Sequence, residues 1–354
     1  WGIDVVLLFG DQRPLHVLAH AMASRMGLEI GVFEEGYIRP DHITFESYGV
    51  NARSRLCPVT DDWQSSPVSD SPLYSVGKAA YWGMVWYAFV YYFAGVLGKP
   101  WFKGYVHHRP LSLLEVIPWV RAVWRKQWYR LTESGLQGRL TGPSSGNYFL
   151  VPLQVFNDAQ ITSELEFYSV DRFIAHVLAS FAAHAPCGTE LVFKHHPMDR
   201  GHTQYAQAIR LGAERAGLTG RVLYIHDQHL PTLLDHARGV VVVNSTVGLS
   251  ALHHGVPTKV CGEALYDQTG LTYGSSLDQF WCAAPQAVPQ RALYWRFREH
   301  MLRHTQLNGS FYKRISASSY KSGLIWREGS AAAQLVEDFP VIESAEESVT
   351  LSPM

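Results

Sequence analysis

Two adjacent carboxylates, Glu34 and Glu35, are the side chains of this sequence best placed to perform chemistry. The apolar run 28–33 predicts a buried strand before them, and Gly36 and Pro40 predict the turn that ends it. Ligands of open α/β sheets bind at the carboxyl ends of the strands, where this pair would lie. Neighbouring like charges raise each other's pKa, which suits acid–base or nucleophilic catalysis. The pair would also suit an ordinary solvated turn, so its meaning depends on the rest of the chain.

Three later runs of polar residues each follow a predicted strand. In Lys194-His195-His196-Pro197 the proline fixes the backbone, while the ammonium and the imidazoles can contact a phosphate or a leaving group. A solvated basic loop is the alternative. We expect Lys194, His196 and Pro197 to contribute to nucleotide binding.

The other two runs lie further along the chain. Ser245 and Thr246 precede a predicted helix, where hydroxyls and free backbone N–H groups can hold an anion, although simple capping would also explain them. Glu263 follows the predicted strand 258–260 and places a carboxylate where a ribose could donate hydrogen bonds. Together the three runs predict a nucleotide site.

Several common sites are missing from the sequence. It contains no G-x-x-x-x-G-K-[ST], which excludes a P-loop NTPase, and no G-x-G-x-x-G after a strand, which disfavours a dinucleotide oxidoreductase. There is no H-E-x-x-H or other metal-ligand spacing, so we expect neither a catalytic metal nor another cofactor.

The composition fits a large α/β enzyme. The chain has 354 residues, 47% of them hydrophobic, which is enough for two cores. Its 30 Lys and Arg balance 31 Asp and Glu, so the charge does not predict a nucleic-acid partner. The cysteines are too far apart for a zinc site or a disulfide framework, and we expect a reducing cytoplasm. They are Cys57, Cys187, Cys261 and Cys282.

Strands and helices alternate in two parts of the chain, which predicts two doubly wound α/β domains with parallel sheets. The first, residues 1–58, should contain a strand at 4–9, a helix from Pro14 to about residue 26, and the strand of the acidic pair. The second, residues 143–290, should be followed by a closing helix at 291–314 and a largely disordered tail at 315–354. In the second domain, strands are expected at 148–152, 190–193, 222–225, 240–243 and 258–260, and helices at 163–183, 204–216, 232–237 and 247–254.

Residues 59–142 differ from both domains and are expected to form an aromatic and basic helical insertion. The stretch 79–97 has 19 residues without a charge, eight of them aromatic. It could therefore pack within the protein, lie at a lipid interface or span a membrane. Residues 116–131 combine cations with Trp, as a membrane-surface helix does, although a solvated face with aromatic core contacts is the alternative. We predict that the insertion contacts a membrane without crossing it. The cations of the second helix are Arg121, Arg125, Lys126 and Arg130.

An acidic pair in one doubly wound domain and a cradle for phosphate and ribose in another describe a GT-B glycosyltransferase. Such an enzyme would hold the donor nucleotide on the second domain and perform the chemistry between the domains. The compact cationic run His107-His108-Arg109 could contact the phosphate of an acceptor, and so could Arg39 beside the acidic pair.

Seven motifs, in the same order along the chain, resemble the KpsS-type capsule polysaccharide proteins of Gram-negative bacteria. The resemblance covers nearly the whole of residues 1–314. That family also looks related to bacterial sialyltransferases, which share an acidic pair before Gly, a His-Pro motif and a Ser/Thr pair. The motifs are Phe33-Glu-Glu-Gly-Tyr-Ile-Arg-Pro40, Gly49-Val-Asn51, His107-His-Arg-Pro110, Val151-Pro-Leu-Gln154, Lys194-His-His-Pro197, Asn244-Ser-Thr-Val-Gly248 and His304-Thr-Gln-Leu-Asn-Gly-Ser-Phe-Tyr312.

The resemblance implies a β-Kdo transferase that starts the lipid-linked oligo-Kdo linker of a capsule. Kdo would pass from CMP-β-Kdo to a (lyso)phosphatidylglycerol at the cytoplasmic face of the inner membrane, where the protein would be peripheral and meet other capsule assembly proteins. Retention of configuration would fit a carboxylate nucleophile. Matched by motif, Glu35 with its neighbour Glu34 would be catalytic, His196 would be the His-Pro histidine, and Ser245 with Thr246 would bind phosphate.

The chain opens unlike that family. Trp1 is not a start residue, and the family's opening Gly-rich strand-turn element is not found, so we expect an N-terminally truncated first domain. Two other classes of function stay open. A non-catalytic capsule polysaccharide export component would need the membrane contact but not the acidic pair, and a nucleotide-sugar epimerase would not need the Trp-rich helix.

Overall fold

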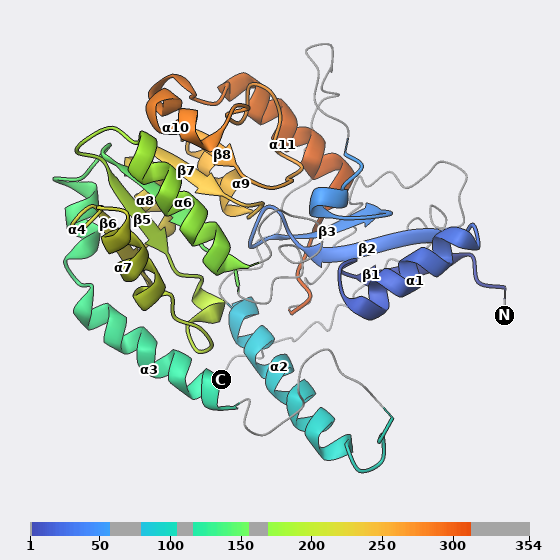
Figure 1. The fold of residues 1–354 in the computed structure, drawn as a ribbon. Coiled ribbons are helices and arrows are strands. Elements are labelled where there is room, and N and C mark those ends of the chain that lie inside the picture. Colours follow the sequence, from blue (N-terminus) through green and yellow to red (C-terminus); the bar gives the residue numbers. More distant parts are fainter. Residues whose placement is uncertain (1, 57–78, 105–115, 156–168, 313–354) are drawn as a thin grey trace, which may run out of the picture.

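The structure is a computed structural model that describes residues 2–56, 79–104, 116–155 and 169–312. Two β-sheets organise it, one near each end of the molecule in Figure 1, with helices around them. The chain begins in the first sheet, builds the second, and returns to the first near residue 306.

The first sheet has the strand order β1-β2-β3-β9. Strand β1 (Val5–Phe9), helix α1 (Pro14–Arg25) and β2 (Glu29–Glu35) form the predicted β-α-β unit with parallel strands. Strand β3 (His42–Ser47) runs antiparallel to β2 and also to β9 (Gln306–Asn308). The prediction of a doubly wound parallel sheet is therefore wrong for this half of the protein.

The turn between β2 and β3 explains the difference. A parallel return needs a crossover of a dozen or more residues, and only six separate these strands. Gly36 makes the short turn possible, because a Cβ there would lie 2.1 Å from the carbonyl oxygen of His42. The chain must therefore come back antiparallel, with the acidic pair at the mouth of the turn.

The second sheet has the strand order β6-β5-β4-β7-β8, and all its strands are parallel. This confirms the predicted doubly wound sheet, with the order reversing between β4 and β7. The bounds agree closely with those expected from the sequence. They are β4 Tyr148–Pro152, β5 Glu190–Lys194, β6 Val222–Ile225, β7 Gly239–Val242 and β8 Thr258–Val260.

Helices cover both faces of the second sheet, and β4 divides its side chains between them. Phe149 and Val151 belong to one core, formed with α6 (Val170–His184), α7 (Ala206–Arg215) and α10 (Leu277–Ala283). Tyr148 and Leu150 belong to the other core, which is formed with four other helices. Those are α4 (Leu136–Thr141), α8 (Leu230–His236), α9 (Val247–His253) and α11 (Arg291–Thr305). Three short 3₁₀ turns, η1 (Asn51–Arg53), η3 (Pro197–Asp199) and η4 (Ala284–Gln286), complete the described elements.

The predicted closing helix at 291–314 is only partly correct. Helix α11 ends at Thr305, and the next residues form β9, which pairs with β3 of the first sheet. The side-chain amide of Gln306 accepts a hydrogen bond from the backbone N–H of Tyr37 at 3.0 Å and donates one to the hydroxyl of Thr44 at 2.9 Å. These buried hydrogen bonds fix where the helix stops.

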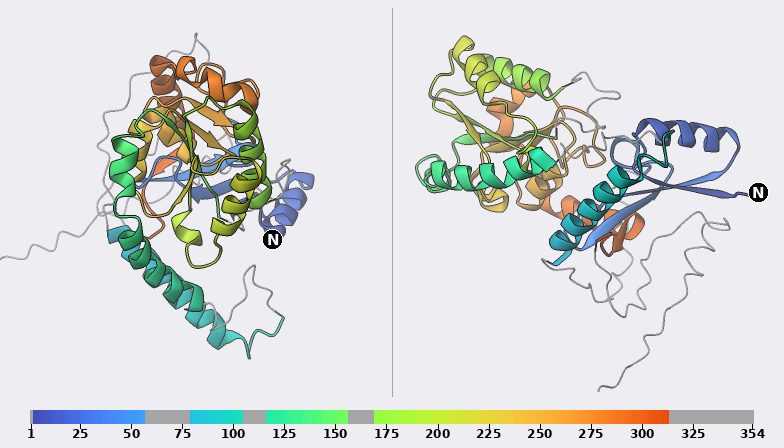
Figure 2. Two further views of the ribbon diagram at one scale, coloured as in Figure 1. Left: turned by 60° about the vertical axis from the view of Figure 1, so that its left-hand side comes forward. Right: turned by 90° about the horizontal axis from the view of Figure 1, so that it is seen from below.

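Both helices expected in the insertion are present, as α2 (Ala79–Gly98) and α3 (Val116–Thr132). Helix α3 runs along the helices of the second sheet, and α2 lies below the first sheet in the view of Figure 1. Figure 2 shows both helices from below in its right-hand view. Of the helices that the structure describes, none is long and apolar enough to cross a bilayer.

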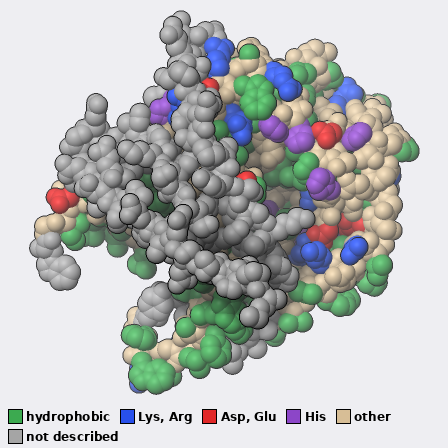
Figure 3. All heavy atoms as spheres, turned by 180° about the vertical axis from the view of Figure 1, so that it is seen from behind, with side chains coloured by type: hydrophobic (Ala, Val, Ile, Leu, Met, Phe, Trp, Pro, Cys, Tyr) green, Lys and Arg blue, Asp and Glu red, His purple; other side chains and the backbone are tan. Residues whose placement is uncertain are grey.

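The two insertion helices expose many large apolar side chains. Trp101, just after α2, is 78% exposed, and Trp124 of α3 is 62% exposed. Figure 3 shows a group of hydrophobic side chains at the lower edge of the back face, over the C-terminal end of α2. The other exposed ones in this region include Trp86, Tyr87, Phe89, Tyr91, Phe93, Leu97, Phe102, Val120, Val123, Trp128 and Leu131.

Candidate active site

The predicted nucleotide residues gather at the carboxyl edge of the second sheet, because its strands are all parallel. Beside the reversal of strand order, Gln154 follows β4 and Asn244 follows β7. The side-chain amide of Gln154 donates a hydrogen bond to the Asn244 oxygen at 2.7 Å, and both residues are buried. This bond ties the two loops together at the place where ligands of such sheets bind.

Ser245 and Thr246 form the turn into α9. The Ser245 hydroxyl accepts a hydrogen bond from the N–H of Val247 at 3.2 Å, which is the capping role that the sequence left open. The Ser245 carbonyl accepts a hydrogen bond from the Tyr266 hydroxyl at 2.5 Å. A Cβ at Gly248 would lie 2.2 Å from that hydroxyl, so only glycine fits there. Buried Tyr266 thus supports the turn from below.

Within the run 194–197, His196 is half-buried, whereas Lys194 and His195 are buried and Pro197 is exposed. The Nδ1 of His196 accepts a hydrogen bond from the N–H of Met198 at 3.2 Å. Burial, and next the charge of Arg39, lower the pKa of His196 to about 4. The ring is therefore neutral at pH 7, and its proton lies on Nε2, which can donate to an anion. Pro197 follows as the first residue of η3.

Lys194 and His195 are buried and already engaged. The Lys194 ammonium donates to the carbonyl of His226 at 2.8 Å, and burial lowers its pKa to about 8. His195 is hydrogen-bonded through Nδ1 to the Tyr224 hydroxyl at 2.6 Å, and burial lowers its pKa to about 3. Both side chains hold the loop in place rather than presenting themselves at the edge.

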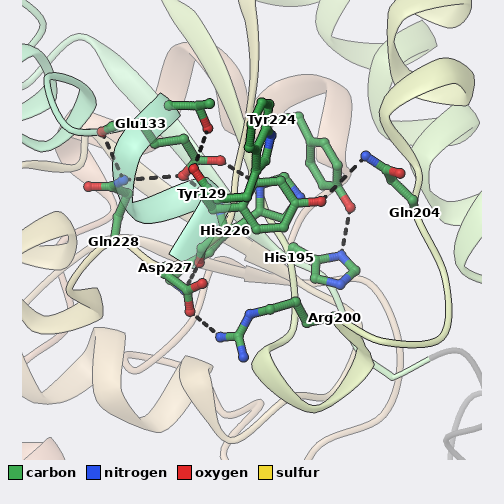
Figure 4. Close-up of polar contacts among 12 residues, drawn as sticks. Tyr129, Glu133, His195, Arg200, Gln204, Tyr224, His226, Asp227 and Gln228 are labelled. Atoms are coloured by element: carbon green, nitrogen blue, oxygen red, sulfur yellow. Dashed lines mark hydrogen bonds and ion pairs between the residues drawn. The ribbon is translucent and has the colours of Figure 1, made fainter. Parts of the chain in front are cut away.

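Behind the His-Pro loop lies a buried network that the sequence did not predict (Figure 4). Glu133, just after α3, accepts a hydrogen bond from the backbone N–H of His226 at 3.0 Å, and its other oxygen is hydrogen-bonded to the Nδ1 of His226 at 2.5 Å. The Tyr129 ring stacks on the His226 ring with centroids 3.5 Å apart. Burial alone would raise the pKa of Glu133, but the hydrogen bonds from His226 outweigh it and the pKa is lowered. The signal for this network in the sequence is weak, because it consists of a lone carboxylate after a basic helix.

Two arginines of α3 bind the loop that follows the His-Pro motif. Arg121 Nε donates to the carbonyl of Gly201 at 2.5 Å, and Arg125 donates to that of Arg200 at 2.8 Å. A Cβ at Gly201 would lie 2.0 Å from the carbonyl oxygen of Pro118, so the helix backbone touches this loop directly. The expectation that Arg121 and Arg125 are available to lipid headgroups is therefore corrected.

The acidic pair lies at the end of β2, as predicted. Glu34 Oε1 accepts a hydrogen bond from the backbone N–H of Glu35 at 3.0 Å, and burial raises the pKa of Glu34. Glu35 Oε1 accepts a hydrogen bond from the hydroxyl of Tyr312 at 2.7 Å. The two neighbouring carboxylates therefore differ in surroundings and in partner.

The charge of Arg39 influences both the acidic pair and the His-Pro loop. Its Nε donates to the carbonyl of Gly36 at 3.0 Å, which places the guanidinium over the turn. Its charge lowers the pKa of Glu34, against burial, and adds to burial in lowering the pKa of His196. Arg39 therefore lies within electrostatic range of both Glu34 and His196.

A buried carboxylate, Glu46, supports the turn after the pair through Tyr37. The Tyr37 hydroxyl donates to Glu46 Oε1 at 2.6 Å and accepts from the N–H of Asn51 at 2.6 Å. Ser54 donates to the other oxygen of Glu46. Glu46 is 5% exposed, and burial raises its pKa to about 7. Nothing in the sequence pattern marked this residue.

The remaining candidates are less informative. Glu263 is exposed at the end of its loop. His107, His108 and Arg109 lie outside the described residues. Among the described residues, no group of three or more His, Cys, Asp or Glu could hold a metal ion.

Comparison with known proteins yields one family and several relatives. A family model for capsule polysaccharide biosynthesis proteins matches residues 4–312. The chain is 42% identical over 313 residues to the capsule polysaccharide export protein KpsS of Escherichia coli, which covers 88% of this chain and 80% of that protein. It is 39% identical over 319 residues to the capsule polysaccharide modification protein LipB of Neisseria meningitidis serogroup B, which covers 88% and 76%.

One solved structure is similar at a lower level. It is a KpsC β-Kdo 2,7 transferase of Thermosulfurimonas dismutans, with a TM-score of 0.44 and 16% identity over 86% of this chain and 78% of that one. A likeness of this degree carries no argument about function.

Proposed function

Because this chain belongs to the capsule polysaccharide biosynthesis protein family, we propose that it is a glycosyltransferase that takes Kdo from CMP-β-Kdo. The matches to KpsS and LipB confirm the resemblance seen in the motifs. The acceptor in this proposal is a phosphatidylglycerol-type lipid at the cytoplasmic face of the inner membrane. The product would begin the Kdo linker of the capsule.

One observation supports the proposal: the charge of Arg39 acts on Glu34 of the acidic pair and on His196 of the His-Pro loop. A sugar nucleotide needs donors for its phosphate and a carboxylate at its anomeric carbon. His196, with its proton on Nε2, and the turn of Ser245 and Thr246 would bind the phosphate of CMP. Arg39 would contact the charged groups between this site and the acidic pair.

The reaction would proceed in two displacements. An oxygen of Glu35 bonds to the anomeric carbon of Kdo while the bond to the phosphate oxygen breaks, and CMP leaves with that electron pair. The acceptor hydroxyl then bonds to the same carbon, gives its proton to a base and releases Glu35. Two inversions retain the β configuration. Glu34 is suited to be the base, because burial raises its pKa and so makes the carboxylate a better proton acceptor.

The exposed apolar side chains of α2 and α3 support the membrane part of the proposal. Trp and Tyr with neighbouring Lys and Arg are typical of protein surfaces at the headgroup level of a bilayer. Lys99, Lys103, Lys126 and Arg130 are exposed beside these aromatics. A protein held there would reach a lipid whose chains stay in the membrane.

The proposal is tested with the purified chain, CMP-β-Kdo and phosphatidylglycerol vesicles, by following CMP release and by mass spectrometry of the lipid. We expect Glu35→Gln to lower turnover by several orders of magnitude, beyond the roughly 10²–10⁴-fold of acid–base help alone, with CMP affinity unchanged. Glu214→Gln, on the surface of α7, is the matched control and should be fully active.

Two results would reject the proposal or its central residue. Turnover of Glu35→Gln within about tenfold of wild type would remove Glu35 from the chemistry. A folded wild-type protein that binds vesicles but transfers no sugar would favour the non-catalytic export component, whereas conversion of the free nucleotide sugar without a lipid product would favour the epimerase.

A further inference from the structure

Tyr312 is separated by 277 residues from Glu35, yet it is the residue that donates to this carboxylate. The bond from its hydroxyl to Glu35 Oε1 is 2.7 Å long. Burial, and next the hydrogen bond and the charge of Glu35, raise the pKa of Tyr312, so the phenol keeps its proton. It is a permanent donor at neutral pH, and it occupies one oxygen of the carboxylate.

The segment that carries Tyr312 is anchored on both sides of the acidic pair. The N–H of Gly309 donates to the carbonyl of Asp41 at 2.9 Å, which fixes the segment to the end of the β2–β3 turn. The Phe311 ring packs edge-on against Phe9 of β1 with centroids 5.0 Å apart, and against Phe33 of β2 at 6.3 Å. The segment therefore crosses the carboxyl ends of β1 and β2 and brings Tyr312 to the pair.

Helix α2 holds Tyr312 from the opposite side. A Cβ at Gly83 would lie 2.5 Å from the backbone carbonyl oxygen of Tyr312, so the helix backbone rests directly on this residue. The same helix carries much of the exposed apolar surface. Tyr312 is thus held between the acidic pair and α2.

We propose that Tyr312 is a positioning residue for Glu35: its hydroxyl fixes one carboxylate oxygen so that the other faces the sugar, and α2 holds Tyr312 through Gly83. The inference rests on the proposed transferase function and assigns a role to a residue that touches no reacting atom. A fixed carboxylate loses less freedom when it attacks, so the hydrogen bond acts on turnover rather than on binding.

The test compares kcat and KM for transfer to phosphatidylglycerol vesicles. Tyr312→Phe removes a hydrogen bond to a charged group, and we expect kcat to fall about 10- to 100-fold with KM and CMP affinity within about twofold. The matched control is Tyr294→Phe in α11, which removes a hydroxyl that is hydrogen-bonded to His253 of α9 at 3.3 Å. This variant should keep wild-type kcat.

Two further variants separate positioning from other effects. Gly83→Ala pushes the Tyr312 backbone and should lower kcat like Tyr312→Phe, whereas Gly138→Ala in α4, where a Cβ meets nothing, should not. Glu35→Asp withdraws the carboxylate from the Tyr312 hydroxyl. Adding Tyr312→Phe to Glu35→Asp should therefore lower kcat by less than about a further twofold.

The outcomes distinguish this inference from the function on which it rests. If wild type transfers Kdo and Tyr312→Phe has the same kcat, the inference is wrong and the function stands. If Tyr312→Phe costs as much in the Glu35→Asp background as in wild type, Tyr312 acts independently of Glu35 and the inference is again wrong. If folded wild type transfers no sugar, the function fails and the inference with it.

Discussion

Glu34 and Glu35 have different surroundings although they are neighbours in the chain. Glu34 is turned into the protein, where a Cβ at Gly10 would lie 3.3 Å from its Oε2, and burial raises its pKa. Glu35 is held at one oxygen by Tyr312. Neighbouring carboxylates with different surroundings can take the separate roles of base and nucleophile.

Glu46 makes the stability of the protein depend on pH. Its pKa is about 7 in the folded protein and 4.5 in the ordinary case, so the folded state favours the protonated form. The stabilisation from that proton is fully present below pH 4.5 and is lost as the pH rises through about 7. We expect Glu46→Gln, which keeps the size, to be more stable than wild type by about 3 kcal/mol at pH 8 and by little at pH 4.5.

Urea unfolding at several pH values between 4.5 and 8 measures this difference. Glu214→Gln should follow the wild-type pH profile, because that carboxylate lies on the surface of α7. Parallel profiles for wild type and Glu46→Gln would show that Glu46 is ionised in the folded protein at neutral pH.

At the residue scale, local pattern predicted the groups at strand ends and missed those that support them. Glu34 and Glu35 end a recognisable strand, and His196 and Ser245 each follow one. Glu133 contacts His226 across 93 residues, a pairing that no local pattern encodes. The sequence also could not distinguish accessible basic side chains from buried ones. Lys194 and His196 belong to one run, but Lys194 is buried and bonded to the His226 carbonyl, whereas His196 is half-buried.

Helix α3 carries two kinds of surface. Arg121, Arg125 and Tyr129 face the loop around Gly201 and the network of His226. Trp124 and Trp128 lie on the exposed side, stacked on each other with centroids 5.7 Å apart. A basic and aromatic composition predicted the membrane side but not the protein side, because Arg serves both purposes equally well.

The cations of α3 should therefore separate into two pairs in experiments. Lys126→Gln with Arg130→Gln should weaken binding to phosphatidylglycerol vesicles about 30-fold at low salt, since each exposed cation contributes about 1 kcal/mol. Arg121→Gln with Arg125→Gln should instead lower the free energy of unfolding, because four backbone and side-chain acceptors in the 200–204 loop lose their donors.

Vesicle flotation and urea unfolding of both double variants provide the measurements. High salt should release the wild-type protein from the vesicles. Equal loss of vesicle binding in both double variants, without a change in stability, would show that all four cations face the lipid. Wild type that resists extraction with alkaline carbonate would contradict peripheral binding.

Across the whole molecule, Gln306 joins the two halves. It follows α11, which packs on the second sheet. Its side-chain amide is hydrogen-bonded to Tyr37 and Thr44 of the first half. Gln306→Leu should lower the free energy of unfolding by about 1–3 kcal/mol, because the buried Tyr37 N–H loses its acceptor. The control is Gln207→Leu, at an exposed position of α7. Urea unfolding of the two variants checks the prediction, and equal stability would contradict it.

The second sheet was predictable from sequence, whereas only the β1-α1-β2 unit of the first sheet was. Apolar runs between helices mark β4 to β8 because both of their faces are buried. In β3 the polar residues His42, Thr44 and Glu46 are buried and hydrogen-bonded, and apolar Phe45 is buried too, so the strand lacks the usual alternation of buried apolar and exposed polar residues. Strand β9 has only three residues and owes its existence to a partner at the other end of the chain.

The pairing of β9 with β3 also sets a timetable for the protein's synthesis. Thr44 leaves the ribosome 262 residues before Gln306, its hydrogen-bonding partner. At about 5–20 residues per second, this interval lasts roughly 13–50 s. During that time the second sheet can fold while the acidic pair still lacks Tyr312. The nascent chain can thus fold its second sheet first, and the arrangement around Glu35 is completed only when residues 2–312 have emerged.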